Sequence, residues 1–356
     1  MNNHFDNEKK VPTRLSRSVG CMLGGAVGDS LGAAVEFLSL DQIRRRYGRF
    51  GITQFEEAYG RKGAITDDTQ MLLFTAEGLI LSKVRTEYAD GDLAIQAIYH
   101  AFLRWLFTQD THRQAQLIKD FGACSVIDGI LTGYKDLFSQ RAPGNSCLSA
   151  LRSGKMGTMD QPINDSKGCG GVMRVAPIGL AYPDAERAFL LGCDSAAITH
   201  GHPTGYLSAG FLASLISRIV LNEPILGAIS DSIRILRSYK SNAECLRAVE
   251  GAVDLSQNQN PSPEVIESIG GAGWVADEAL AIGLYCALVA GDDFSRGVIL
   301  AANHSGDSDS TGSITGNIVG ARYGTEVIPN EWLSDLEMKE VIEEVATDLL
   351  DQFIKE

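Results

Sequence analysis

Glycine recurs at every fourth position in two segments of the chain. The residues are Gly20, Gly24, Gly28 and Gly32 in the first segment and Gly312, Gly316, Gly320 and Gly324 in the second. On an α-helix this spacing places all four glycines of a segment along one stripe. Each glycine inside a helix costs roughly 1 kcal/mol relative to alanine. Two such stripes therefore predict helices whose backbones lie close to neighbouring helices. The alternative is coincidence among the 38 glycines of the chain.

Helical periodicity dominates the remaining sequence and predicts an all-α fold. Amphipathic patterns cover residues 68–81, 93–107, 184–198, 206–221 and 243–255. Residues 279–290 are apolar almost all round, which indicates a buried helix. Alternating patterns are scarce, and residues 52–55 form one short strand at most. We therefore predict a compact multi-helix bundle, and the lack of a fixed repeat argues against a solenoid.

Domain organisation follows from the connectors, which are short. Residues 1–14 are polar and mixed in charge, with Pro12 near their end, which is typical of a flexible N-terminal tail. No long linker divides the rest of the chain. Residues 15–356 are therefore predicted to form one helical domain.

Charge and cysteine usage exclude several classes of protein. A net charge of -14 argues against nucleic acid as a partner, because such proteins present basic surfaces. The seven cysteines are scattered without Cys-x-x-Cys spacing, which argues against a zinc finger and a disulfide framework. A reduced, cytoplasmic setting is the simplest expectation. Arg14, Arg17 and the apolar run 19–27 imitate a signal peptide, but Asp29 interrupts the pattern. No apolar run approaches the roughly 18 residues of a membrane span, so no membrane partner is expected.

Three short segments combine carboxylates with hydroxyl groups. They are Gly28-Asp29-Ser30 with Glu36, Thr66-Asp67-Asp68-Thr69, and Ser305-Gly306-Asp307-Ser308-Asp309-Ser310-Thr311. Any one of them alone is best interpreted as a helix cap, with Thr66 as the N-cap and the acids favoured by the helix dipole. Together they point to Mg²⁺ or Mn²⁺, because hard cations prefer oxygen ligands and would neutralise clustered carboxylates. Few histidines or cysteines lie near them in the sequence, which disfavours zinc.

The three segments, in this order and placement, resemble the ADP-ribosylglycohydrolase family. The likeness spans about residues 19–325. It implies an orthogonal all-α bundle with two Mg²⁺ or Mn²⁺ ions in a central cleft. By this resemblance the metal ligands are Thr66, Asp67, Asp68, Asp307, Asp309 and Ser310, where Ser310 stands at a position that is often threonine in the family. Glu36 matches a position that contacts the metal centre or the reacting ribose.

Three further segments match regions of the family that contact substrate. Gly168, Gly170 and Gly171 lie in a segment that resembles a loop cradling ADP-ribose, and exposed backbone amides suit a diphosphate. His200 resembles a histidine that approaches the ligand, with His202 a weaker match. Trp274 resembles a residue that lines the substrate. The plainer alternatives are a flexible connector for the glycines, structural roles for the histidines and a core position for the tryptophan.

By this resemblance the protein hydrolyses the N-glycosidic bond between ADP-ribose and a side chain of a modified protein. Such a reaction passes through an oxocarbenium-like transition state, and Asp68 or Glu36 is the expected general base. Resemblance to bacterial members favours arginine as the acceptor, with serine-linked and small-molecule ADP-ribose as alternatives. A phosphatase is disfavoured, because strands are scarce.

Two hypotheses of other classes remain. One is a catalytically silent binder of the crystallin type, against which the intact acidic segments argue. The other is an immunity protein that occludes an ADP-ribosyltransferase toxin. In that hypothesis the N-terminal tail enters the toxin, and Arg14 or Arg17 imitates the target arginine.

Overall fold

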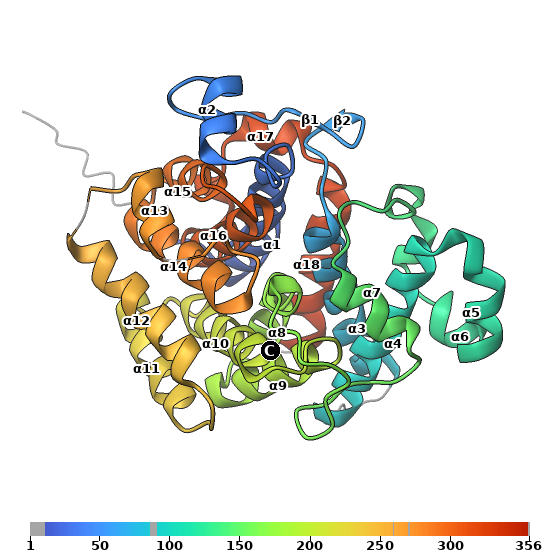
Figure 1. The fold of residues 1–356 in the computed structure, drawn as a ribbon. Helices are drawn as coiled ribbons and strands as arrows, with labels where there is room; N and C mark the ends of the chain where they lie inside the picture. Colours follow the sequence, from blue (N-terminus) through green and yellow to red (C-terminus); the bar gives the residue numbers. More distant parts are fainter. Residues whose placement is uncertain (1–10, 86–90, 259, 270, 355–356) are drawn as a thin grey trace, which may run out of the picture.

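The computed structural model describes residues 11–85, 91–258, 260–269 and 271–354. These residues form a helical bundle with one small hairpin (Figure 1). The α-helices are α1 (Arg14–Gly32), α2 (Leu40–Tyr47), α3 (Asp67–Arg85), α4 (Gly91–Gln109), α5 (Gln114–Phe121), α6 (Ala123–Val126), α7 (Asn145–Arg152), α8 (Ala176–Ala181), α9 (Ala185–Ala197), α10 (Pro203–Ile219), α11 (Ile225–Arg237), α12 (Ala243–Asn258), α13 (Pro263–Ile269), α14 (Ala276–Ala290), α15 (Phe294–Ala302), α16 (Ser308–Tyr323), α17 (Asn330–Asp335) and α18 (Lys339–Phe353). The 3₁₀ helices are η1 (Thr111–Arg113), η2 (Leu131–Gly133), η3 (Lys135–Leu137), η4 (Cys169–Gly171) and η5 (Thr325–Val327), and the strands are β1 (Glu57–Ala58) and β2 (Arg61–Lys62).

The two glycine stripes pack against each other along the antiparallel pair α1 and α16. A methyl group on Gly316 would overlap the carbonyl of Gly24, and one on Gly28 would overlap that of Gly312. Gly32 meets the backbone of Ser308. The prediction of close backbone approach is confirmed, and coincidence is excluded as its explanation. This packing brings the C-terminal end of α1 beside the N-terminal end of α16, so that the segment carrying Glu36 lies next to the third acidic segment.

The predicted helices correspond to α3, α4, α9, α10, α12 and α14, with boundaries shifted by a few residues. Helix α14 is buried along most of its length, as its apolar composition predicts, and Gly283 lets it approach Ile314 on α16. The predicted strand at residues 52–55 is wrong. Ile52 and Phe55 are buried in a loop, where side-chain burial alone accounts for their apolar character. The hairpin follows at Glu57–Ala58 and Arg61–Lys62.

The N-terminal segment enters the bundle at the end of α1 that is remote from the acidic residues. The Thr13 side chain caps α1, so the helix begins at Arg14, one residue before the predicted boundary. Residues 1–10 lie outside the described residues. Helix α1 is about 27 Å long, so its first residue lies roughly that far from the turn that carries Glu36.

Arg17 is not available to imitate a target arginine. Its side chain is 3% exposed and donates hydrogen bonds to the Val220 carbonyl and to Asn222 Oδ1. Arg14 is partly buried within the first turn of α1. The part of the occlusion hypothesis that relied on Arg17 is therefore wrong, because this side chain belongs to the packed domain. No helix among the described residues has both the length and the apolar character needed to cross a bilayer.

Candidate active site

The three acidic segments meet in one cavity of about 210 Å³. Its wall contains Glu36 from the turn after α1, Asp67 and Asp68 from the start of α3, and Asp307 and Asp309 from the start of α16. Segments separated by more than 200 residues in the chain thus contribute to one site. This is the convergence that the sequence predicts for a metal centre.

Carboxylate oxygens of Glu36, Asp307 and Asp309 all lie within 4.8 Å of one another. All three side chains are buried, with 5%, 3% and 2% of their surface exposed. Within the described ranges, none of the five cavity carboxylates has a lysine, arginine or histidine at ion-pair distance. Glu36 Oε2 and Asp68 Oδ2 are buried without any hydrogen-bond partner. Oxygen atoms arranged in this way suit a divalent cation, which supplies the missing positive charge.

Burial raises the pKa of every one of these carboxyl groups, and repulsion by neighbouring carboxylates adds to the shift for all of them except Asp309. Burial, followed by Asp309 and Asp307, raises the pKa of Glu36 to about 11. Burial and then Asp309 also raise the pKa values of Asp67, Asp68 and Asp307 well above the usual range. Without a cation, therefore, these groups cannot all be ionised at neutral pH.

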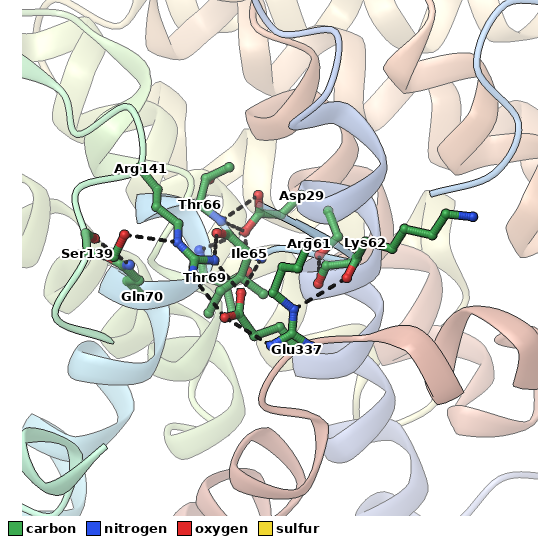
Figure 2. Close-up of polar contacts among 12 residues, drawn as sticks. Asp29, Arg61, Lys62, Ile65, Thr66, Thr69, Gln70, Ser139, Arg141 and Glu337 are labelled. Atoms are coloured by element: carbon green, nitrogen blue, oxygen red, sulfur yellow. Dashed lines mark hydrogen bonds and ion pairs between the residues drawn. The ribbon is translucent and has the colours of Figure 1, made fainter. Parts of the chain in front are cut away.

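Asp29 holds the start of the second acidic segment; it belongs to the first acidic segment but was not among the predicted site residues. Its carboxylate accepts hydrogen bonds from the backbone N–H of Thr66 at 3.0 Å and of Thr69 at 3.2 Å, and from the Thr69 hydroxyl at 2.5 Å (Figure 2). Burial and then Asp309 raise the pKa of Asp29 to about 7, although these hydrogen bonds oppose the shift. The signal was present in Gly28-Asp29-Ser30, but nothing in the sequence shows that Asp29 faces the start of α3.

A second buried carboxylate, Glu337, holds the same segment from the opposite side. Glu337 accepts hydrogen bonds from both terminal nitrogens of Arg141 and from the backbone N–H of Ile65 at 3.0 Å (Figure 2). Arg141 in turn donates to the Ile65 carbonyl at 2.9 Å. Thr66 and the two aspartates that follow are thereby fixed between Asp29 and Glu337. No sequence pattern distinguishes Glu337 or Arg141 from other charged residues.

The capping interpretation holds for Thr66 but fails for Asp307. The Thr66 hydroxyl accepts a hydrogen bond from the Asp68 N–H at 3.2 Å, so Thr66 is the N-cap of α3. Thr66 is fully buried and stands behind the cavity wall. Asp307 occupies the N-cap position of α16, yet its side chain makes no capping hydrogen bond. Its carboxylate faces the cavity instead.

The predicted glycine loop forms η4 and is held in place by its neighbours. Cys169 N–H donates to the Trp274 carbonyl at 3.2 Å, and Ala276 N–H donates to the Lys167 carbonyl at 2.8 Å. Gly168 and Gly170 line the cavity. Gly171 does not, because its α-carbon faces Ala196. The prediction that Gly171 lines the ligand is therefore not supported by its position, and its missing side chain serves helix packing.

Sulfur lies closer to the acidic residues than the sequence analysis expected. The Cys169 thiol donates to Asp307 Oδ2 at 2.8 Å, and the Ser310 hydroxyl lies 3.7 Å from Cys169 Sγ. Cys147 also lines the cavity. Few cysteines lie near the acidic segments in the sequence, but the fold brings Cys169 and Cys147 to the cavity from distant positions in the chain.

The two predicted histidines have different roles. His200 is 2% exposed and lines the cavity, and its Nδ1 lies 2.8 Å from the Thr199 hydroxyl. His202 caps α10, because its Nδ1 accepts a hydrogen bond from the Thr204 N–H at 3.1 Å. His202 is absent from the cavity wall, so its plainer structural interpretation is the correct one.

Trp274 lies at the rim of the cavity and is 42% exposed. It stacks on Phe37, with ring centroids 5.7 Å apart and an angle of 18° between the rings. Phe37 is 69% exposed. The core interpretation of Trp274 is therefore wrong. Phe37 was missed by the sequence analysis, because a single aromatic residue beside Glu36 carries no distinguishing pattern.

Comparison with known proteins agrees with this geometry. The family model described as ADP-ribosylglycohydrolase matches residues 10–356. The ADP-ribosyl-[dinitrogen reductase] glycohydrolase of Rhodospirillum rubrum is 25% identical over 335 residues, covering 92% of each chain. ADP-ribosylarginine hydrolase Tri1 of Serratia proteamaculans is 25% identical over 339 residues, covering 94% of this chain and 79% of its own.

A solved structure shares the fold. It is an ADP-ribosylglycohydrolase-related protein complex, 26% identical in sequence, with a TM-score of 0.68 over 96% of this chain and 99% of the other. The family model covers nearly the whole chain, and the acidic segments on which the resemblance rested line one cavity. The chain belongs to the ADP-ribosylglycohydrolase family.

Proposed function

We propose that this protein hydrolyses the N-glycosidic bond that links ADP-ribose to arginine side chains of a modified protein. The observation that carries the proposal is the cluster of five buried carboxylates without cationic partners among the described residues. In the proposal, two Mg²⁺ or Mn²⁺ ions are held by Thr66, Asp67, Asp68, Asp307, Asp309 and Ser310. The donor set consists of oxygens, which suits these cations.

The carboxylates supply the proton chemistry. When bound, the divalent cations would orient the ribose hydroxyls and make a water molecule more acidic. Asp68 Oδ2 and Glu36 Oε2 are the two oxygens without partners, so either can accept a proton from the attacking water. Glu36 groups with Asp307 and Asp309 around one point, whereas Asp68 does not. We therefore assign the general base to Asp68 and a ribose- or metal-contacting role to Glu36.

Two matched variants separate these roles. Asp68→Asn should lower kcat even at saturating Mn²⁺, because Asp68 is assigned as the base as well as a metal ligand. Glu36→Gln should weaken Mn²⁺ or substrate binding more than it lowers kcat. The two measurements are initial rates at saturating substrate and titration calorimetry with Mn²⁺. The reverse pattern would exchange the two assignments.

The remaining wall suits the rest of ADP-ribose. Gly168 and Gly170 present backbone beside the acidic cluster, and His200 adds a ring nitrogen. Backbone N–H groups and a neutral imidazole can donate to diphosphate oxygens. The cavity, at about 210 Å³, is smaller than the roughly 300–1,000 Å³ that encloses a drug-sized ligand. Part of ADP-ribose would therefore extend beyond the cavity.

The acceptor side chain is assigned from the aromatic pair at the rim. Phe37 directly follows Glu36, and Gly273, the neighbour of Trp274, lies beside Asp307. The pair thus flanks the acidic end, where the bond to the acceptor would lie. A guanidinium stacks favourably on aromatic faces, especially near negative charge, whereas a serine hydroxyl gains nothing comparable.

The test compares two substrates under two conditions. ADP-ribose release should be measured from one peptide modified on arginine and from one modified on serine, with Mg²⁺ or Mn²⁺ and with excess chelator. Release from the arginine substrate only, and only with metal, is expected. Phe37→Ala should raise KM for the arginine substrate, while Phe50→Ala, at an exposed phenylalanine outside the cavity wall, serves as the matched control. Preference for the serine substrate would contradict the assignment of arginine, and full activity in chelator would contradict the metal mechanism.

A further inference from the structure

Arg174 is a fully buried cation without a carboxylate at ion-pair distance among the residues that the structure describes. Its guanidinium lies over the ring of Phe102, 4.1 Å from the centroid. Arg174 Nη2 donates to the Thr199 hydroxyl at 2.7 Å and to the Ser195 carbonyl at 3.3 Å. Its Nη1 lies 3.5 Å from the sulfur of Cys147. Burying a charge without a counter-charge is costly. The hydrogen bonds that Arg174 makes to its neighbours therefore call for a functional explanation.

The direction of the hydrogen bonds follows from the chemistry of arginine. A guanidinium can only donate, so the Thr199 oxygen accepts from Arg174 and its own proton remains free to be donated. The candidate acceptors are His200 Nδ1, 2.8 Å away, and the sulfur of Cys147. An imidazole nitrogen is a much stronger acceptor than a thiol sulfur. The Thr199 hydroxyl therefore donates to Nδ1, and the ring proton of His200 resides on Nε2.

The environment also keeps the ring of His200 neutral. Burial, and secondarily the charge of Arg174, lower the pKa of His200 to about 3. A neutral imidazole carries one proton, and the contact with Thr199 decides which nitrogen holds it.

Nε2 lies against the glycine loop inside the cavity. A β-carbon at Gly168 would stand 3.4 Å from Nε2 and one at Gly170 would stand 3.2 Å from it, so glycine allows the imidazole to lie close to the loop. His200 is 98% buried but lines the cavity, and no partner for Nε2 is found among the described residues. The nitrogen is thus a donor directed toward whatever binds at the loop.

We propose that Arg174 and Thr199 hold His200 as the Nε2–H tautomer, so that its neutral imidazole donates a hydrogen bond to a phosphate oxygen bound at the glycine loop. Arg174 and Thr199 are then positioning residues, since they act through His200. Naming the ligand as the diphosphate of ADP-ribose rests on the proposed function. The tautomer itself depends only on this protein's own hydrogen bonds.

The tautomer can be measured directly in the wild-type protein without ligand. Nitrogen-15 NMR of histidine-labelled protein distinguishes the protonated from the unprotonated ring nitrogen, and the spectrum of His200→Gln identifies the signal among the six histidines. We expect an unprotonated Nδ1 and a protonated Nε2. A protonated Nδ1, or a mixture of the two tautomers, would overturn the proposal. This measurement does not require any variant to be active.

Binding of ADP-ribose then tests the consequence. Titration calorimetry with ADP-ribose in the presence of Mn²⁺ should show that Thr199→Val binds at least about tenfold more weakly than the wild type. The reason is that a misdirected donor loses its strong hydrogen bond to a charged group. Thr199→Ser retains the hydroxyl and should restore affinity. Equal affinity in Thr199→Val and the wild type would refute the relay. A wild type that binds no ADP-ribose would instead refute the proposed function, whatever tautomer the NMR shows.

Discussion

Glu337 and Glu36 are both buried in the same bundle, but their surroundings are opposite. Glu337 is 1% exposed and is paired with Arg141, with Arg61 3.3 Å away. Glu36 is 5% exposed and faces Asp307 and Asp309 without any cation from the described part of the chain. A buried carboxylate with its own arginine is complete, whereas clustered carboxylates without one require a partner from outside. The difference separates a structural ion pair from a binding site.

The two regions are also mechanically connected. Glu337 binds the backbone of Ile65, one residue before Thr66, and Asp29 binds the backbone of Thr66 and Thr69. The paired carboxylate therefore fixes the position of the unpaired ones. Arg104 Nε and Glu77 Oε2 form another buried ion pair, at 2.7 Å, elsewhere in the bundle. Changes in the two regions should have opposite consequences for stability and activity.

The largest effect on stability is expected for Glu337→Ala. Removing this carboxylate leaves the buried Arg141 without a counter-charge, and breaking a buried pair typically costs about 3–5 kcal/mol. Urea unfolding followed by circular dichroism measures this loss in the free energy of unfolding. A cost below about 1 kcal/mol would show that water reaches the pair and that the two regions do not differ as described.

Asp309→Asn should lower activity without lowering the stability of the metal-free protein. Changing a residue that only supports a metal ligand typically lowers activity by roughly 10- to 100-fold. Asp309 is itself a proposed ligand, so its loss should lower the rate of hydrolysis by at least about 100-fold. In chelator the variant should be as stable as the wild type or more stable, because one repelling charge is removed. The assay is ADP-ribose release at saturating Mn²⁺ beside urea unfolding in chelator. A folded variant that retains wild-type activity would contradict the metal centre.

The stability of the metal-free protein should decrease as pH rises. The folded-state pKa values of Asp29 and Glu36 are raised, to about 7 and about 11, above the values near 4 of unfolded carboxyl groups. Groups with raised pKa values stabilise the fold fully below the unfolded pKa, and this contribution is lost as pH rises toward the folded value. Unfolding in chelator at about pH 5.5 and about pH 8 should therefore show lower stability at the higher pH.

Divalent metal should oppose this pH dependence. Mn²⁺ at about 100 times its dissociation constant should add about 2.7 kcal/mol of stability, measured at about pH 8. The same addition to Asp309→Asn should have little effect. A wild type whose stability is equal at both pH values in chelator would show that the carboxylates do not repel one another in the folded state.

Arg61→Ala is expected to have the smallest effect. Its side chain is 43% exposed, so its interaction with Glu337 is screened by water and should contribute less than about 1 kcal/mol. The variant sharpens the comparison because it removes an outer cation and leaves the inner pair with Arg141 intact. A cost as large as that of Glu337→Ala would place Arg61, and not Arg141, at the centre of the pair.

Local sequence patterns predicted several of the helices and the acidic residues but not most of the contacts between them. The stripes at Gly24 and Gly316 revealed close helix packing, because glycine is costly in a helix without such a reason. The role of Asp29, the thiol of Cys169 at Asp307 and the pair of Glu337 with Arg141 depend on residues far apart in the chain. Gly171 lies outside the cavity wall, which its sequence could not show, because a glycine that serves packing and one that lines a cavity look the same in a sequence.

Equilibrium binding of Mn²⁺ to the wild-type protein tests the central claim most directly. Titration followed by electron paramagnetic resonance counts free and bound ions without any substrate. We predict saturable binding of two ions per chain, with the affinity strongly reduced in Asp309→Asn and unchanged in Arg61→Ala. A wild type without saturable Mn²⁺ binding, or an Asp309→Asn variant that binds Mn²⁺ as well as the wild type, would contradict the account that the unpaired carboxylates form a metal centre.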